Sequence, residues 1–253
     1  MPPLNLVQPT NGTSPIREFA IVIPARNEEA LLARCLDSVR AAMSFAEEQL
    51  TPDFPALTLT VVADDCTDGT TALARTFPGV QVLEIDAHAV GTARASGIQL
   101  ALATAAFDGD AVWIANTDAD SVVPRNWVLE QLSLANAGVD VMIGTVRPDF
   151  ADLSPAHIRA WRKTRHPGAN GHVHGANLGI RASRYLAAGG FAPLAEHEDV
   201  DLIERCARLG GTTFATDACE VMTSGRHHGR TPGGYARYLR VDLLARAAST
   251  SPR

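Results

Sequence analysis

The first half of the chain alternates short apolar runs with stretches whose apolar residues recur at helical spacing. The run Phe19-Ala-Ile-Val-Ile23 ends at Pro24 and predicts a buried strand. Apolar residues then recur every three or four positions from Leu31 to Met43, which predicts an amphipathic helix over residues 28–45. The same alternation predicts strands at 57–63, 80–85 and 111–115, and helices at 70–77 and 90–104.

The second half is less regular. The pattern predicts a helix over 122–135, a strand over 139–144, two short strands within 212–222 and a last helix over 235–247. Apolar residues at helical spacing predict another helix over 199–209, which Gly210-Gly211 would stop. The stretch 224–234 is rich in glycine and predicts a loop.

Polar and acidic residues directly follow three of the predicted strands. Glu28 lies just beyond the first strand, Asp64 and Asp65 follow the second, and Asp118-Ala-Asp120 follows the fourth. Strands that alternate with helices form parallel sheets, and ligands bind such sheets at the carboxyl ends of the strands. We therefore expect an α/β fold in which these residues converge on one site.

Composition and charge narrow the class of protein. Apolar residues make up 46% of the 253, enough to bury the core of a single globular unit. The net charge of −6 disfavours nucleic acid as a partner, and no apolar run is long enough to predict an integral membrane segment. Residues 1–16 lack the features of a secretory signal and are interpreted as a flexible tail. The four cysteines form no C-x-x-C pair, which favours reduced thiols and a cytoplasmic location, free or at a membrane surface.

Asp118 and Asp120 form a D-x-D pair after the apolar run Val112-Trp-Ile-Ala115. Hard divalent cations prefer oxygen ligands, and Mg²⁺ or Mn²⁺ is typically held by one or two carboxylates together with substrate phosphates. A solvated turn would also place two acids here, so the pair by itself is a weak signal. Its position at the end of a buried strand favours a metal and phosphate site.

Five segments in a fixed order strengthen this interpretation. They are Ile23-Pro-Ala-Arg-Asn-Glu-Glu29, Val61-Val-Ala-Asp-Asp-Cys-Thr-Asp-Gly-Thr70, Gly91-Thr-Ala-Arg94, Asn116-Thr-Asp-Ala-Asp120 and Glu198-Asp199. With these segments the chain resembles, from about residue 19 to 209, the inverting nucleotide-diphospho-sugar glycosyltransferases of family 2. The resemblance implies the glycosyltransferase A fold, a Rossmann-like mixed sheet flanked by helices. Residues 17–120 would form the nucleotide-binding half of a 17–253 domain, and residues 121–253 the acceptor-side half.

The resemblance also implies roles for individual residues. Asp120 would hold the metal that bridges the diphosphate, and Asp199 of the Glu198-Asp199 motif would be the catalytic base. Asp118 would face the ribose, and either Asp64 or Asp65 would bond the base of the nucleotide. Further donor contacts are implied for Pro24, Ala25, Glu28 and Arg94, although an exposed helix arginine would also explain Arg94.

The loop 224–234 contains Arg226, His227, His228 and Arg230. Arginines suit phosphate oxygens, so we expect Arg226 and Arg230 at the donor, with His228, or else His227, as a candidate metal ligand. Glycines within the loop would let it close over the donor. An exposed polar loop is the simpler interpretation.

The chain departs from the family pattern in lacking the C-terminal Q-x-x-R-W motif. This disfavours processive polysaccharide synthesis and favours a single transfer to a small-molecule or lipid-linked acceptor. A nucleotidyltransferase would open with a glycine-rich loop, and an aspartate-nucleophile phosphatase would carry its D-x-D after the first strand, so both rank low. The alternative from another class is a catalytically inactive relative that binds a nucleotide or sugar.

Overall fold

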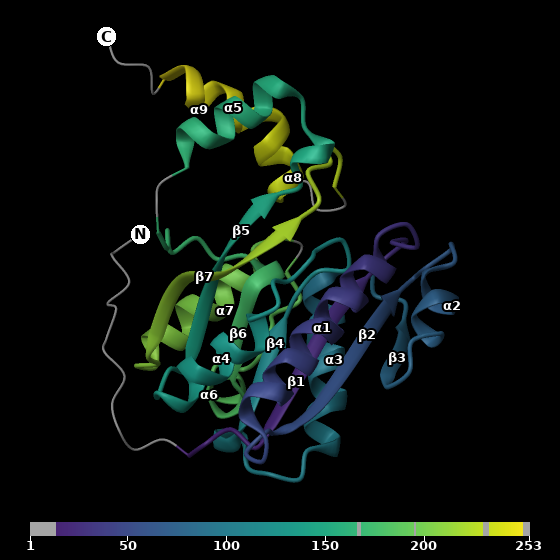
Figure 1. Cartoon of the computed structure of the whole chain (residues 1–253), viewed down its shortest axis with the longest axis vertical. Coiled ribbons are helices and arrows are strands. Elements are labelled where there is room, and N and C mark those ends of the chain that lie inside the picture. Colours follow the sequence, from purple (N-terminus) through teal and green to yellow (C-terminus); the bar gives the residue numbers. More distant parts are fainter. Residues whose placement is uncertain (1–13, 166–167, 195, 230–232, 250–253) are drawn as a thin grey trace.

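A computed structural model describes residues 14–165, 168–194, 196–229 and 233–249 (Figure 1). Its centre is a seven-stranded mixed sheet in the order β3-β2-β1-β4-β6-β5-β7. The strands β3, β2, β1 and β4 are parallel, β6 is antiparallel to both of its neighbours, and β7 is parallel to β5. The strands are β1 (Glu18–Ala25), β2 (Ala56–Asp64), β3 (Val80–Ile85), β4 (Val112–Asn116), β5 (Val141–Pro148), β6 (Leu178–Arg181) and β7 (Thr213–Thr223).

Helices cover both faces of the sheet, and each face has its own core. The α1 and α4 face packs against one cluster of buried residues, and the α3, α6 and α7 face against a second. The helices are α1 (Leu32–Leu50), α2 (Thr70–Arg75), α3 (Val90–Thr104), α4 (Trp127–Asn136), α5 (Pro155–Thr164), α6 (Ala182–Ala187), α7 (Glu198–Arg208), α8 (Tyr235–Arg237) and α9 (Leu243–Ser249). Within this part of the chain, no helix is long and apolar enough to span a membrane.

The two cores explain why β1 reads as one continuous apolar run. Phe19, Ile21 and Ile23 belong to the α1 core, whereas Val22 between them belongs to the α3 core. Alternate side chains point to opposite faces, so a strand covered on both faces has no polar positions. On the α3 side, a Cβ at Gly97 would lie 2.6 Å from Val22 Cγ1, so this glycine lets the helix approach the sheet closely.

A small helical lobe stands at one end of the sheet (Figure 1). It consists of α5, α8 and α9, and β5 and β7 extend toward it. Its own cluster of buried residues includes Trp161, Leu239 and Leu243. The helix α5 was not predicted, although Ser154 caps it by accepting a hydrogen bond from the His157 N–H, and Pro155 occupies its first turn.

The regular first half follows the predicted pattern, whereas three predictions for the second half need correction. The helix predicted over 122–135 begins only at Trp127, because Val122 pairs with Met222 through two backbone hydrogen bonds of 2.7 and 3.0 Å. The two strands predicted within 212–222 are one strand, β7, which pairs with β5 on both sides of an irregularity in register. The last predicted helix is divided by a π-helical turn, Tyr238–Asp242.

The predicted tail is shorter than expected. Ile16 is buried, and its N–H donates a 2.8 Å hydrogen bond to Asn136 Oδ1. The folded part therefore begins before residue 17, and residues 1–13 lie outside the described chain.

Candidate active site

A cavity of about 1040 Å³ opens where β1, β2 and β4 end. Its wall also includes the first turns of α3 and α7 and the loop after β7. The sequence-predicted residues that line it are Pro24, Ala25, Glu28, Asp64, Arg94, Asp118, Asp120, Glu198, Asp199 and Arg226. The strand ends therefore converge on one cavity, as expected.

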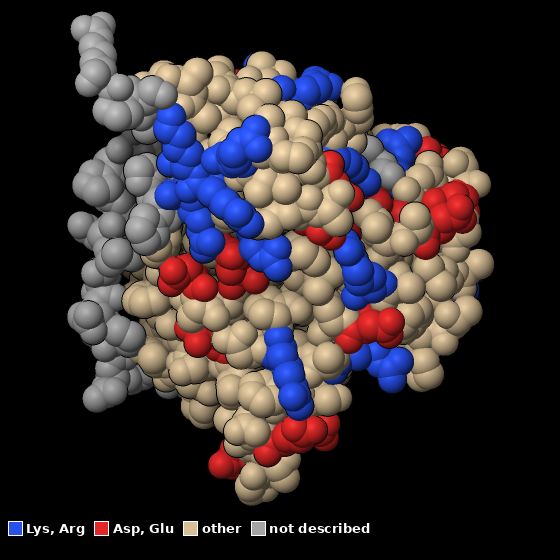
Figure 2. All heavy atoms as spheres, turned by 45° about the horizontal axis from the view of Figure 1, so that its top comes forward, with Lys and Arg blue, Asp and Glu red and all other residues tan. Residues whose placement is uncertain are grey.

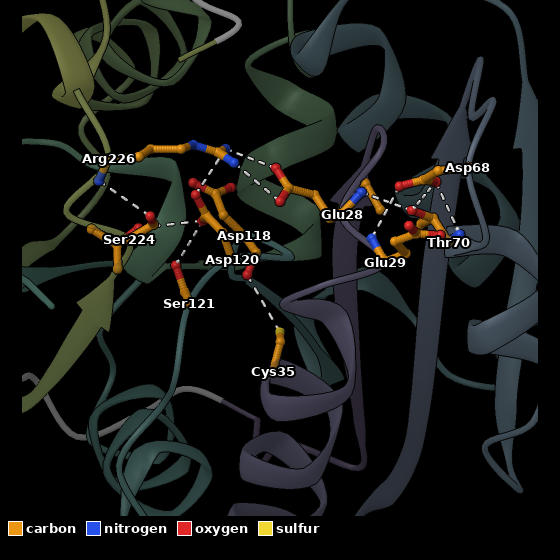
Figure 3. Close-up of polar contacts among 12 residues, drawn as sticks. Glu28, Glu29, Cys35, Asp68, Thr70, Asp118, Asp120, Ser121, Ser224 and Arg226 are labelled. Atoms are coloured by element: carbon orange, nitrogen blue, oxygen red, sulfur yellow. Dashed lines mark hydrogen bonds and ion pairs between the residues drawn. The ribbon is translucent and has the colours of Figure 1, made fainter. Parts of the chain in front are cut away.

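The D-x-D pair lies directly beyond β4 (Figure 3). The Asp118 carboxylate is partly exposed and pairs with Arg94, Oδ1 to Nη2, at 2.7 Å. The Asp120 side chain is only 12% exposed, and its Oδ1 accepts a 3.3 Å hydrogen bond from the Thr223 hydroxyl. Burial, and after it the charge of Asp118, raises the pKa of Asp120 to about 6. A carboxylate in such surroundings is stabilised in its ionised form by a neighbouring cation.

Arg226 supplies that cation in this structure (Figure 3). Its guanidinium lies 2.9 Å from Asp120 Oδ2 and also donates two hydrogen bonds, of 2.7 and 3.1 Å, to the two carboxylate oxygens of Glu28. The side chain thus joins the loop after β7 to the loop after β1 and to the D-x-D pair. The contacts of Arg226 place the start of the loop 224–234 over the strand-end side of the cavity.

Arg94 links the D-x-D pair to the first turn of α7. It is 3% exposed, and its guanidinium pairs with Asp118 and, through a very short contact, with the buried carboxylate of Glu198. A Cβ at Gly175 would lie 2.2 Å from Arg94 Nη2, and one at Gly91 would lie 2.9 Å from Glu198 Cγ. Both glycines therefore leave room for this ion pair. The interpretation of Arg94 as an exposed helix arginine is wrong.

Asp199 lies beside Glu198 with its carboxylate held by two backbone N–H groups. Oδ2 accepts from Gly175 and Oδ1 from Val200, each at 2.8 Å. A carboxylate oxygen has two lone pairs, so each oxygen keeps one for another donor. Asp201, two residues further on, instead pairs with Arg205 at 2.8 Å. The geometry thus separates Asp199, which lines the cavity, from its acidic neighbour.

Asp64 and Asp65 differ in their surroundings. The buried carboxylate of Asp64 accepts hydrogen bonds of 2.7, 2.9 and 3.0 Å from the N–H groups of residues 87, 88 and 89. It thereby fixes the turn that leads into α3. Asp65 has φ of 48°, is not among the residues lining the cavity and pairs with Arg26 at 2.9 Å. Asp65, Asp86 and His88 place possible ligand atoms within 4.8 Å of one another, but the Arg26 guanidinium already neutralises Asp65 there.

The structure does not bring His228 to the D-x-D pair. His228 is exposed and is not among the residues lining the cavity, and the ring of His227 contacts that of His157 at a tilt of 48°, with ring centroids 4.6 Å apart. Arg230 lies outside the described residues. Among the described residues named in this loop, Arg226 therefore lies at the strand ends, where it contacts Glu28 and Asp120.

Sequence reasoning did not single out His174, which lines the cavity next to Asp199. It precedes Gly175, whose N–H bonds Asp199, and its ring meets the Tyr235 ring edge to face at 5.8 Å. Burial lowers the pKa of His174 to about 4, against the opposing charge of Asp199. The imidazole is therefore neutral near pH 7. No spacing in the sequence marks this residue, because its neighbours come from distant elements.

Comparison with known proteins identifies the class to which this site belongs. The family model described as glycosyl transferase family 2 matches residues 20–184. The chain belongs to this family, and the expectation of a glycosyltransferase that uses a nucleotide-sugar is confirmed at that level. Among curated proteins, no sequence matches the chain.

Solved structures share the fold. TarS 1–349 of S. aureus in complex with UDP-GlcNAc is 14% identical, with a TM-score of 0.62, and the match covers 93% of this chain and 68% of TarS 1–349. The mannosyltransferase PcManGT from Pyrobaculum calidifontis, in complex with GDP-Man and Mn²⁺, is 22% identical with a TM-score of 0.60, and the match covers 98% of this chain and 76% of PcManGT. The predicted glycosyltransferase A fold is therefore confirmed.

Proposed function

We propose that this protein transfers a hexose from a nucleoside-diphosphate donor to an acceptor hydroxyl with inversion, using Mg²⁺ or Mn²⁺. The observation that carries the proposal is the convergence of the D-x-D pair and the Glu198-Asp199 pair on one cavity through the buried Arg94. These acids are about eighty positions apart in the sequence. A solvated D-x-D turn would not require a buried arginine that joins it to a second acidic motif.

The residues at Asp120 fit a divalent cation. The buried carboxylate already contacts a positive group, the Arg226 guanidinium, which marks the position as one that requires a cation. Carboxylate oxygens are also the ligands that Mg²⁺ and Mn²⁺ prefer. A bound divalent ion would supply charge neutralisation for the leaving diphosphate. Asp120 would hold it, and Asp118 would orient the donor beside it.

Asp199 is proposed as the general base. Its two backbone hydrogen bonds hold the carboxylate in one orientation, and its remaining lone pairs can accept the proton of an acceptor hydroxyl. Attack from the side of Asp199, opposite the leaving group, gives inversion. Arg94 keeps the base and the donor site in register, because it pairs with Asp118 on one side and Glu198 on the other. Pro24, Ala25, Glu28 and Asp64 are proposed to border the nucleotide.

The donors bound by the similar structures, UDP-GlcNAc and GDP-Man, support a nucleoside-diphosphate hexose as the donor class. The free thiols of Cys35, Cys66, Cys206 and Cys219 favour a reducing compartment, so we propose the cytoplasm as the location.

The test measures binding of UDP and of GDP by calorimetry, with Mn²⁺ and with chelator. We expect binding that needs the metal, and Asp120→Asn should lose the metal-dependent part while remaining folded. At a hundredfold excess over Kd the bound ligand should stabilise the native protein by about 2.7 kcal/mol. Asp37→Asn, at an exposed position of α1 that does not line the cavity, is the matched control and should bind normally.

Equal affinity in Mn²⁺ and in chelator would contradict the metal role. Metal-dependent binding without any donor hydrolysis or transfer would favour the inactive, nucleotide-binding alternative.

A further inference from the structure

The cavity continues beyond the strand ends to the helical lobe, and the two ends differ in charge. At the strand ends, six carboxylates stand against three arginines: the acids are Glu28, Asp64, Asp118, Asp120, Glu198 and Asp199, and the arginines are Arg26, Arg94 and Arg226. The lobe end is lined by Lys163, Arg165 and Arg246 against the single carboxylate of Glu220. Figure 2 shows Lys and Arg side chains gathered over the lobe, next to a group of acidic side chains.

The three cations come from the end of α5 and from α9, two helices that pack together in the lobe. The Lys163 ammonium, near the end of α5, donates a 2.8 Å hydrogen bond to the Ala247 carbonyl of α9. Arg165 follows α5, stacks on the Trp161 ring at 5.0 Å and pairs with Glu220 at 2.8 Å. Arg246 of α9 lies over the Tyr238 ring at 5.6 Å. Packing and ring contacts thus hold these side chains in fixed positions, which lowers the entropy cost of binding an anion.

A continuous series of contacts connects this end with the proposed base. Asp199 accepts from Gly175, and the preceding residue, His174, meets the ring of Tyr235. Tyr235 stacks on Tyr238 at 5.8 Å, and Tyr238 lies beneath Arg246. An acceptor whose hydroxyl approaches Asp199 can therefore extend along the rings of Tyr235 and Tyr238 toward the three cations.

Two simpler explanations account for only part of this cluster. A basic residue in the last turn of a helix is favoured by the helix dipole, which explains Lys163 and Arg246 separately but not why they line the same cavity as Arg165. A generally basic surface would also gather cations, but the chain carries a net charge of −6. Neither explanation accounts for three cations, from two helices and a loop, along one cavity.

We propose that the lobe end of the cavity binds a phosphate or carboxylate group of the acceptor, and that the acceptor is an anionic hydroxyl compound. The inference rests on the proposed transfer reaction, since it assigns this end to the acceptor. The anion has two sources: a soluble phosphate ester, or the phosphate of a lipid that presents the acceptor at a membrane. The chemistry of recognition is the same for both.

The experiment separates this subsite from the donor site by filling the latter. The protein is saturated with UDP or GDP and Mg²⁺, and methyl phosphate is titrated and followed by ³¹P NMR. In parallel, sedimentation with phosphatidylglycerol vesicles and with phosphatidylcholine vesicles tests the lipid source. The variant Lys163→Gln/Arg165→Gln/Arg246→Gln is compared with the wild type, and Arg159→Gln/Arg162→Gln serves as the control. Arg159 and Arg162 are exposed on α5 but are not among the residues lining the cavity.

We expect the triple variant to bind methyl phosphate at least about tenfold more weakly, since charge-assisted hydrogen bonds are lost. The control variant should bind like the wild type, and the nucleoside-diphosphate affinity should stay the same in all three proteins. Binding only to phosphatidylglycerol vesicles, with the same dependence on the variants, would assign the anion to a lipid.

Equal loss in the control variant, equal binding by wild type and triple variant, or no binding of either probe would overturn the proposal. Nucleoside-diphosphate binding is measured separately beforehand. Its failure would contradict the proposed function, whereas normal nucleotide binding combined with any of these three results contradicts only the anionic subsite.

Discussion

The strand-end part and the lobe end of the cavity use charge in opposite ways. At the strand ends the charged groups pair with one another around a buried centre, as in the contact of the buried Arg94 with Asp118 and the buried Glu198. At the lobe end the cations are exposed, and Arg165 is 42% exposed where it pairs with Glu220. Removing one partner of a buried ion pair lowers the free energy of unfolding strongly, because the remaining charge is left without water or a partner. Removing an exposed pair changes it little. The strand ends thus hold buried pairs before a ligand arrives, while the lobe end presents exposed cations to the cavity.

The largest effect should follow from removing the proposed base. Asp199→Asn keeps the shape of the side chain and one of its two backbone hydrogen bonds, because the amide nitrogen cannot accept from an N–H, and the amide cannot take the hydroxyl proton. We expect kcat to fall by about 10²–10⁴ with unchanged nucleoside-diphosphate affinity. Steady-state transfer or donor-hydrolysis assays and calorimetry measure the two quantities.

Asp201→Asn is the control for this variant, because Asp201 belongs to the same helical turn but pairs with Arg205. Near-normal turnover of Asp199→Asn, or a product of retained anomeric configuration by NMR, would remove Asp199 from this role.

The next effect concerns stability at the strand ends. Arg94→Met leaves Asp118 and the buried Glu198 without their cation, which should lower the free energy of unfolding by about 3–5 kcal/mol. Urea unfolding measures this value. Arg94→Lys retains the charge but not the forked guanidinium that reaches both carboxylates. Its free energy of unfolding should therefore lie between those of the wild type and Arg94→Met. A loss below about 1 kcal/mol, as for an exposed pair, would contradict the contrast between the two ends.

A smaller, pH-dependent effect is expected where the two ends meet. Burial lowers the pKa of His174 to about 4, so between pH 4 and 6.5 the unfolded chain binds a proton there that the native protein does not. The contribution of His174 is therefore complete above pH 6.5 and is lost as pH falls toward 4, by about 1.4 kcal/mol per pH unit at most.

His174→Asn should remove this part of the pH dependence of the unfolding free energy, while His228→Asn, at an exposed position in the loop after β7, should leave it unchanged. If the wild type and His174→Asn have parallel pH profiles, the imidazole does not stay neutral in the native state.

The smallest effect should come from the lobe. Arg165→Gln removes an exposed pair with Glu220, so the free energy of unfolding should change by only about 0–1 kcal/mol. Urea unfolding beside Arg94→Met gives the comparison directly. A loss as large as that of Arg94→Met would mean that Arg165 supports the lobe rather than being available to a ligand.

Secondary structure was predicted correctly where the local residue pattern agreed with the packing of the element on the sheet. The helix over 90–104 and the strand over 80–85 lie as predicted, because the apolar residues of both elements also pack against the buried core of the sheet. Prediction failed where distant pairing overrides local preference, as at Val122, which a helical pattern includes but Met222 holds as a β-bridge. Of the helices in the lobe, the helix over 235–247 was predicted but α5 was missed, since α5 is short and packs on the other lobe helices.

The sequence by itself determined the α/β class, the family and the acids at the strand ends, because these depend on short segments whose order and spacing are visible in one dimension. Only the tertiary structure decided which charges meet. Arg226 reaches Glu28 across 198 positions, Arg94 reaches Glu198 across 104, and His174 borders Asp199 without any marking pattern. Ion pairs and desolvation depend on distance and burial in space, and neither quantity can be read from separation along the chain.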